Sequence, residues 1–481
     1  MEDLIHVCPP LAFLPRFQRF LHGLHIIPPF LGFGIRSHFC HIRVIILAGI
    51  LEITEKIAAL VEYRVILDVA LLDHRQHARP DLRVTLLVFL ETICLDLYDT
   101  AIPFHVLTNP RALVNSRYHL NVFNYLERLR CRVYRGSTVN HKERFFATIE
   151  RRHVDRPASW LGMPTTAALP GLFKHFRVHN IDELKVKLDD DIYPVDVPYH
   201  SPVANHIACA FPFAKSTAPD YENRTLTTPG FFEGFTDPAK VDDFNWPDPG
   251  LYIDPNECRA SVQDVPNDYA VLGILWSAHF QDACAAFGMA NALVTMLRYP
   301  SMFKAVIDRI VEFYLKANEI FFKATKGKID AVLIGNDFGG QQGLLLSRRH
   351  VQKFVMPGTK QLIAHAKKYG LKIMHHSCGS VYELIPDFID AGADIVHPIQ
   401  ALATNMEPAR LKESFGDKVA FCGAVDTQDL LVRGSQGQVR DKVHELKKIF
   451  PTGLIISPSH EALLPDVPPA NVEAMFQAVK D

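Results

Sequence analysis

Residues 139–481 of this 481-residue chain are predicted to form an α/β domain, a (β/α)8 TIM barrel. Two observations predict this fold class. Short apolar runs of strand length alternate with helical stretches, which is typical of a parallel sheet covered by helices. Polar clusters that contain histidine and cysteine directly follow several of these runs. Because the carboxyl ends of barrel strands meet at one face, where active sites lie, these clusters are predicted to gather at one site.

The individual elements follow from the apolar pattern along the chain. The segment Arg156–Leu161 is predicted to be a turn that leads into a strand, and the acidic run Asp189–Asp191 is interpreted as a solvated turn. At least six strand–helix units in a domain of this size favour a closed barrel over an open sheet. Strands are predicted at 269–276, 329–334, 372–375, 394–397, 419–421 and 454–456, and helices at 141–150, 293–297, 302–324, 348–369, 381–391 and 469–479.

Residues 1–138 form an atypical N-terminal extension. They contain a single lysine, Lys56, although arginine and histidine are plentiful, and regular periodicity is hard to find. One hypothesis is an accessory domain. The favoured hypothesis is a translated upstream stretch that never evolved as protein. The true start would then lie near Val139, because valine is what a GTG start codon encodes when it is translated internally.

The overall composition excludes several classes of protein. Hydrophobic residues make up 48% and charged residues 22%, as in soluble globular proteins. The net charge of −2 does not point to nucleic acid or an acidic membrane as a partner. We found no apolar run of membrane-spanning length, and Met1-Glu2-Asp3 is acidic where a secretory leader would be basic. A cytoplasmic protein is therefore expected. The nine cysteines lack the regular spacing of a disulfide framework.

His376 and Cys378 are the strongest candidates for chemistry, since they lie two residues apart just after a predicted strand. Imidazole and thiolate together suit Zn²⁺, and a catalytic zinc site uses three protein ligands and one open position. His460 is the predicted third ligand, and Cys422 is the alternative; both follow later strands. By itself a His-x-Cys pair is more often structural than metal-binding.

Other residues near the predicted strand ends are weaker candidates. Asp337, in the segment 336–341, is a plausible base or an orienter of substrate, and Gln341 and His460 are further candidate catalytic residues. His375 should point away from the site and pack between strand and helix. His397 is either a pocket-lining or a structural histidine. Three apolar residues could line a pocket or belong to the core: Met163, Trp276 and Phe338.

As an ordered set, these motifs resemble the uroporphyrinogen decarboxylase superfamily over roughly residues 140–481. The segments that carry the resemblance are Gly335–Gln341 with Ser347, His376–Gly379, Ala391–Asp394 with Pro398–Gln400, Phe421–Asp426, Ser457–His460, Pro465–Pro469 and Asn471. The resemblance implies the barrel fold and offers two chemistries.

True decarboxylases of this superfamily remove acetate carboxyls from a porphyrinogen without metal or cofactor. They carry an Arg-Gln-Ala-Gly-Arg motif whose arginines bind substrate carboxylates, whereas the matching stretch here is Trp160-Leu-Gly-Met-Pro164. The tyrosine expected near 276–280 is also missing. His460 matches the decarboxylase histidine, and Asp191 is the candidate for its catalytic aspartate, so this chemistry is kept as an alternative.

The other branch contains the cobalamin-linked methyltransferases, which bind zinc through His-x-Cys and a later third ligand, usually a cysteine. His376-Ser-Cys378 matches this motif, and His460 stands about where the cysteine would be. The resemblance thus implies a Zn²⁺-dependent methyltransferase that works with a corrinoid protein and a thiol or similar acceptor. A non-catalytic corrinoid-binding barrel is a second alternative. A homo-oligomer is possible, and neither nucleic acid nor membrane is expected as a partner.

Overall fold

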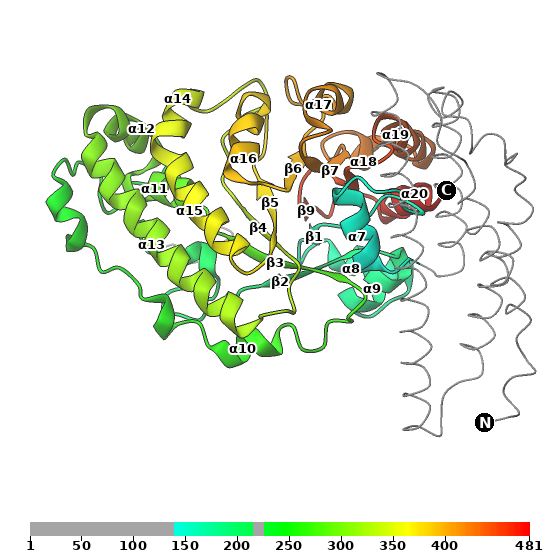
Figure 1. Cartoon of the computed structure of the whole chain (residues 1–481), viewed down its shortest axis with the longest axis horizontal. Coiled ribbons are helices and arrows are strands. Elements are labelled where there is room, and N and C mark those ends of the chain that lie inside the picture. The colour runs from blue at the N-terminus through cyan, green and yellow to red at the C-terminus, as the bar shows by residue number, and fades with distance from the viewer. Residues whose placement is uncertain (1–138, 215–225) are drawn as a thin grey trace, which may run out of the picture. The chain divides into compact units, whose positions relative to one another are not determined.

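Seven parallel strands form the central sheet of the computed structural model, which describes residues 139–214 and 226–481 (Figure 1). Neighbouring strands in the sheet are consecutive in the chain, as a barrel requires. A separate pair of short strands, β1 (Met163–Pro164) and β9 (Ala462–Leu463), lies where the first and last strands end. The central strands are β2 (Ile192–Asp196), β3 (Ala270–Trp276), β4 (Ala331–Gly335), β5 (Lys372–His376), β6 (Ile395–Ile399), β7 (Ala420–Val425) and β8 (Leu454–Pro458).

An eighth segment, residues 158–160, closes the sheet into a barrel and is called the closing segment below. The backbone N–H of Trp160 donates to the Ile456 carbonyl at 3.0 Å, and Ile456 N–H donates to Ala158 at 2.9 Å. On the other side, Asp191 N–H donates to the Ser159 carbonyl at 3.1 Å. The segment therefore lies between β8 and the start of β2, and the predicted (β/α)8 fold is confirmed. The prediction for residues 1–138 lies outside the described residues.

Helices surround the strands, and the long helix α13 runs along the outside in Figure 1. Both faces of each strand are thus covered, which explains the nearly continuous apolar runs. The helices are α7 (His141–Ile149), α8 (Leu169–Phe176), α9 (Ile181–Leu188), α10 (Pro255–Ala260), α11 (His279–Phe287), α12 (Met289–Arg298), α13 (Pro300–Ala324), α14 (Arg348–His350), α15 (Met356–Lys367), α16 (Ile385–Ala391), α17 (Pro408–Phe415), α18 (Leu430–Arg433), α19 (Gln436–Ile449) and α20 (Pro469–Lys480).

The pattern of β3 shows how the two apolar layers arise. Ala270, Leu272 and Ile274 belong to the cluster that fills the barrel interior, whereas Val271 and Leu275 belong to the larger cluster between strands and helices. Successive side chains of a strand point to opposite faces, so one apolar run supplies both layers. The interior layer is thus apolar along β3.

Helix α7 covers the amino-terminal end of the barrel. Its Asn140–Glu143 capping box begins the helix, and Phe145 and Ile149 enter the interior cluster beside Trp160. This confirms the helix predicted at 141–150, because the apolar face read from the sequence is the face that packs into the barrel.

The six predicted strands all occur, within a few residues of their expected bounds. The strand β2 was missed, because Pro194 lies within it and acidic residues precede it. The helix predicted at 348–369 occurs as an unbroken helical run over residues 348–367, in which a π-helical turn, Val351–Val355, joins α14 to α15. Within the described residues, no helix combines the length and apolarity needed to cross a bilayer.

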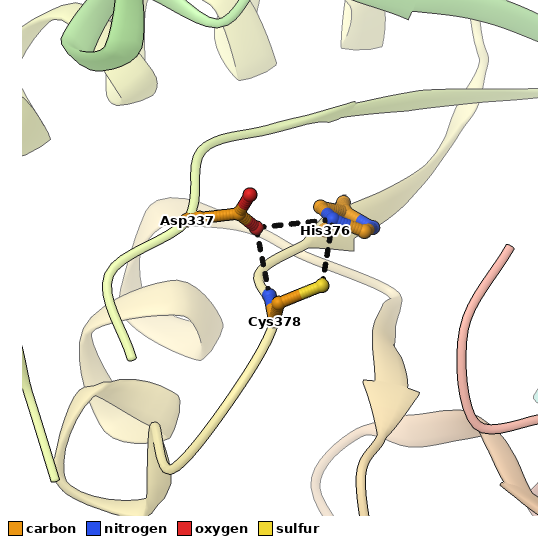
Figure 2. A group of neighbouring side chains, drawn as sticks. All are labelled: Asp337, His376 and Cys378. Atoms are coloured by element: carbon orange, nitrogen blue, oxygen red, sulfur yellow. Dashed lines mark hydrogen bonds and ion pairs between the residues drawn. The ribbon is translucent and has the colours of Figure 1, made fainter. Parts of the chain in front are cut away.

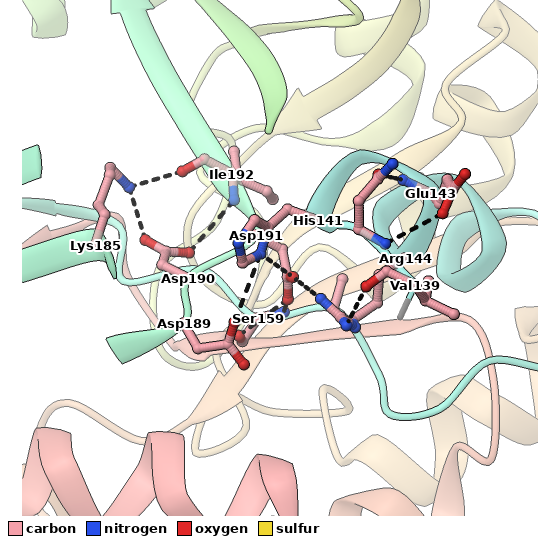
Figure 3. A network of polar contacts seen from close by, with 12 residues as sticks. Val139, His141, Glu143, Arg144, Ser159, Lys185, Asp189, Asp190, Asp191 and Ile192 are labelled. Carbon is pink, nitrogen blue, oxygen red and sulfur yellow. Dashed lines mark hydrogen bonds and ion pairs between the residues drawn. The ribbon is translucent and has the colours of Figure 1, made fainter. Parts of the chain in front are cut away.

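The interpretation of Asp189–Asp191 as a solvated turn is wrong, because Asp190 and Asp191 are fully buried. Arg144 Nη1 lies 2.6 Å from Asp191 Oδ1, and Arg156 Nη1 lies 2.7 Å from Oδ2 (Figure 3 shows the first of these contacts). Both guanidinium groups come from segments far from Asp191 in the sequence. The run is therefore the centre of a buried ion network that joins α7, the closing segment and β2.

Asp190 is paired separately within the same turn. Lys185 of α9 donates to Asp190 Oδ2 and to the carbonyl of Ile192, each at 2.7 Å (Figure 3). The Leu161 N–H also donates to Asp190 Oδ2, at 3.3 Å. Since each buried charge has a partner of opposite sign and hydrogen bonds, the desolvation cost of burial is offset.

We expect the Asp191 network to make stability depend on pH. Burial by itself would raise the pKa of Asp191, but His141, Arg156 and Arg144 hold this pKa below its ordinary value. A group with a depressed folded-state pKa contributes stability above its unfolded pKa, about 3.9, and loses it as the pH falls through the folded value. Urea unfolding at decreasing pH should therefore show a loss of stability below about pH 4. This loss should be smaller in Asp191→Asn, and an identical acid dependence in the two proteins would contradict the assignment.

Candidate metal and catalytic site

His376 and Cys378 stand together at the carboxyl end of β5 (Figure 2). The Nε2 atom of His376 lies 3.6 Å from the Sγ atom of Cys378. His376 is only 3% exposed, whereas Cys378 is half-buried. Gly379, with φ +82°, turns the chain directly after the pair. The side chains of His376 and Cys378, both of kinds that bind metals, thus converge from a single short segment.

Asp337 joins them from the loop after β4. Gly335 pairs with His376 in the sheet, and a side chain at Gly335 would collide with the His376 backbone, so glycine permits this close approach. The Oδ1 atom of Asp337 lies 3.2 Å from His376 Nε2 and accepts the Cys378 N–H at 2.9 Å. Gln281 of α11 donates to Asp337 Oδ2 at 3.0 Å. The carboxylate is therefore held against both residues.

The other ring nitrogen of His376 faces two further polar groups. Its Nδ1 lies 3.0 Å from the Nδ1 of His397 in the middle of β6, and 3.7 Å from Glu461 Oε2. Trp276 packs its ring edge-on against His376, with centroids 5.4 Å apart. The imidazole is thus fixed from several sides, and only its Nε2 faces Cys378 and Asp337.

The electrostatics of the site follow from these contacts. Burial would lower the pKa of His376, but Glu461, Cys378 and Asp337 raise it well above its ordinary value. Burial and the charge of His376 lower the pKa of His397 well below its ordinary value. Burial would raise the pKa of Asp337, but His376 and the Cys378 N–H hold it well below its usual range. The site therefore pairs the Asp337 carboxylate with an imidazole that is surrounded by groups able to carry negative charge.

His460 approaches from the loop after β8. Its Nδ1 accepts the N–H of Ala462 at 3.0 Å and lies 3.6 Å from Glu461 Oε2. A ring nitrogen of His460 also lies within 4.8 Å of the Sγ atom of Cys378. The structure thus brings His460 to Cys378, and it brings Cys378 to His376. In the described part of the chain, however, these three residues do not form one group with all ligand atoms within 4.8 Å of one another.

The donor atoms present fit a zinc ion. Three overlapping groups have ligand atoms mutually within 4.8 Å: Asp337 with His376 and Cys378; His376 with His397 and Glu461; and Cys378 with His460 and Glu461. Nitrogen, sulfur and carboxylate oxygen are the ligands that zinc takes in proteins. Glu461 Oε2 is buried without a hydrogen-bond partner, as expected of an oxygen beside a cation site.

The remaining predicted residues lie away from this point. Cys422 is fully buried in the interior cluster and belongs to none of the three groups. Gln341 is exposed, and its carbonyl accepts the N–H of Thr404. His375 stacks on Phe388 of α16 with centroids 4.1 Å apart, which confirms its packing role between strand and helix.

The apolar candidates divide between site and core. Trp276 contacts His376, and Met163 is partly buried against the interior cluster. Phe338 is a fully buried core residue. Asp191 precedes β2, at the barrel end opposite to the site, so it does not reach the His376 and Cys378 side chains. Asp196 is the last residue of β2 and therefore lies at the same end of the barrel as the site.

Sequence reasoning missed Glu461 and Gln281. Glu461 directly follows His460, and its position in a loop after a strand was the one available signal. Gln281 lies in the first turn of α11, directly after the stretch 276–280, and its position soon after the end of β3 was the one available signal.

Comparisons with known proteins place the chain in a family and agree with its fold. The family model described as uroporphyrinogen decarboxylase (URO-D) matches residues 140–481. A uroporphyrinogen decarboxylase of Chlorobaculum parvum is 25% identical over 198 residues, which cover 40% of this chain and 52% of that protein. The match thus spans about half the length of this relative. A solved structure of a methyltransferase from Methanosarcina mazei is similar with a TM-score of 0.51 and 16% identity, over 71% of this chain and 98% of that chain. This likeness concerns the fold alone. The chain belongs to the uroporphyrinogen decarboxylase family.

Proposed function

We propose that this protein is a zinc-dependent methyltransferase that moves a methyl group between a corrinoid protein and a thiol or similar acceptor. The observation that carries the proposal is the buried convergence of His376 Nε2 and Cys378 Sγ, 3.6 Å apart, with the carboxylate of Asp337 against both. This is a donor set for a catalytic zinc ion with an open position.

Bound zinc would lower the pKa of an acceptor thiol and so supply a thiolate at neutral pH. The residues of the chain prepare the site for this. His397 and Glu461 fix the orientation of His376 through its Nδ1, and Gln281 fixes Asp337. The Trp276 ring packs against His376 and gives the site one apolar side.

The charges around the site argue against a porphyrinogen with its many carboxylates. The groups that surround His376 and His460 are Asp337, Glu461 and Cys378, which are acidic or thiol groups. Carboxylate recognition calls for arginine or lysine. The segment Trp160–Pro164 supplies neither.

A decarboxylase-type lyase is the second candidate. Two observations favour it: the relative from Chlorobaculum parvum bears that name, and His460 stands at the mouth of the barrel. Such an enzyme would use no metal. A corrinoid partner protein, a cytoplasmic location and a homo-oligomeric state belong to the first proposal as expectations.

Metal analysis of the purified full-length protein separates the two candidates. We expect about one zinc per chain, since the site offers one cluster of ligands centred on Cys378. The assay mixes the protein with free methylcobalamin and one of a panel of small thiols, and the absorbance of methylcobalamin reports its demethylation. This demethylation should require the bound zinc. Substoichiometric zinc with metal-independent turnover of uroporphyrinogen would replace the methyltransferase by the decarboxylase.

A further inference from the structure

We propose that Asp337, and not His460, is the third protein ligand of the metal site of His376 and Cys378, and that His460 donates a hydrogen bond to the Cys378 sulfur. The inference rests on the proposed function, because it assumes that the site binds a zinc ion. It assigns Asp337 a role in holding the metal instead of a role as a base.

The distances between donor atoms carry the assignment (Figure 2). With zinc bonded to nitrogen and oxygen at about 2.1 Å and to sulfur at about 2.3 Å, a tetrahedral site separates N from O by about 3.4 Å and N from S by about 3.6 Å. The His376 Nε2 atom lies 3.2 Å from Asp337 Oδ1 and 3.6 Å from Cys378 Sγ. His376 Nε2 thus already stands at ligand spacing from both other donors, and all three ligand atoms lie within 4.8 Å of one another.

The surroundings of Asp337 match those of a ligating carboxylate. Its Oδ1 accepts the Cys378 N–H and keeps a second lone pair for the metal, while its Oδ2 is fixed by Gln281. Carboxylates that bind metals are held by such outer hydrogen bonds. Asp337 and Cys378 are therefore oriented together by one backbone contact.

His460 is in a different situation, because its Nδ1 already accepts the N–H of Ala462 at 3.0 Å. The single proton of a neutral imidazole must then be on Nε2, and that nitrogen has no lone pair left for a metal. An Nε2–H group is instead a donor, and the Cys378 sulfur, within 4.8 Å of a His460 ring nitrogen, is the acceptor nearby. Such a bond stabilises negative charge on the sulfur.

The back of His376 completes the arrangement. Its Nδ1 faces His397 Nδ1 at 3.0 Å and the otherwise unpartnered Glu461 Oε2 at 3.7 Å. A histidine ligand usually donates its other ring N–H to a group of this kind, which fixes the tautomer that leaves Nε2 free to bind. Glu461 and His397 are accordingly positioning residues for His376.

Zinc binding by the full-length protein tests the inference without any assay of activity. Metal-stripped protein is titrated with Zn²⁺ in competition with a chromophoric chelator. Relative to the wild type, His460→Ala should weaken binding by no more than about 10–100-fold, as is usual for outer-shell partners, and Asp337→Asn should weaken it by more than this. Asp429→Asn, which removes an exposed carboxylate paired with Arg433, should bind as the wild type does.

Asp337→Cys guards against a merely structural effect of losing the carboxylate. A thiolate can replace it as a ligand, so this variant should bind Co²⁺ with stronger sulfur-to-metal absorbance than the wild type. The inference would be overturned by an unchanged cobalt spectrum in Asp337→Cys, or by loss of zinc in His460→Ala but not in Asp337→Asn. Either result would leave the proposed function in place. Absence of zinc binding by the wild type would instead overturn the proposed function.

Discussion

Replacing Cys378 by alanine is expected to remove the bound zinc and to lower the rate of methyl transfer from methylcobalamin by at least about 10³-fold, which is about 4 kcal/mol of transition-state stabilisation. The sulfur belongs to two of the three groups of candidate ligands, one with Asp337 and His376 and the other with His460 and Glu461. Zinc content and the initial rate of loss of the cobalt–methyl absorbance measure the two effects on the same preparation.

Cys422→Ala is the matched control for this experiment. Cys422 also lies on a barrel strand, but it is fully buried in the interior cluster among apolar side chains. Burial also raises the pKa of its thiol, which disfavours the thiolate that a metal requires. The control should therefore keep its zinc and its rate. A Cys378→Ala protein that retains full transfer would refute the proposed role of the site.

Replacing Asp191 by alanine should lower the free energy of unfolding by about 3–5 kcal/mol, the usual loss when one partner of a buried ion pair is removed. Arg144 and Arg156 would remain as buried cations, and the Ser159 N–H would lose its acceptor at 2.8 Å. Urea unfolding near neutral pH measures the change, and Asp191→Asn should give a smaller loss because it keeps an acceptor oxygen.

Asp189→Ala offers the comparison within the same turn. The Asp189 side chain is 40% exposed and contacts Arg156 Nη2 at 2.9 Å. An ion pair open to solvent contributes little, so this substitution should cost no more than about 1 kcal/mol. Equal losses from Asp189→Ala and Asp191→Ala would mean that burial of the network does not determine its contribution.

The barrel could be predicted from the sequence because its strands have a strong local signal. The run from Ala270 to Trp276 is apolar throughout, since both of its faces are buried. The strand Ile192–Asp196 has no such signal, because it contains a proline and follows three aspartates. The pairing of those aspartates depends on Arg144 and Arg156, and charge partners at such sequence distances leave no local pattern.

Some residues of the candidate site could likewise be predicted from the sequence, and others could not. His376 and Cys378 could be predicted to act together because two positions on one short segment fix their proximity. Asp337 follows the neighbouring strand, and the barrel order brings it to them. The relation of His460 to Glu461 depends on how the loop after β8 folds back onto Ala462, so sequence order alone could not distinguish ligand from neighbour.

The closing segment of the barrel has a consequence for how the chain is made. Thr165 and Leu463, which hydrogen bond beside that closure, are 298 positions apart along the chain. Contacts between such distant positions form late and slow folding. During synthesis, the segment that completes the barrel leaves the ribosome long before its partner in β8 exists. Until β8 is made, the apolar side chains of this segment, such as Trp160, lack their native neighbours. We expect the chain to be most open to aggregation and to chaperone binding during this interval.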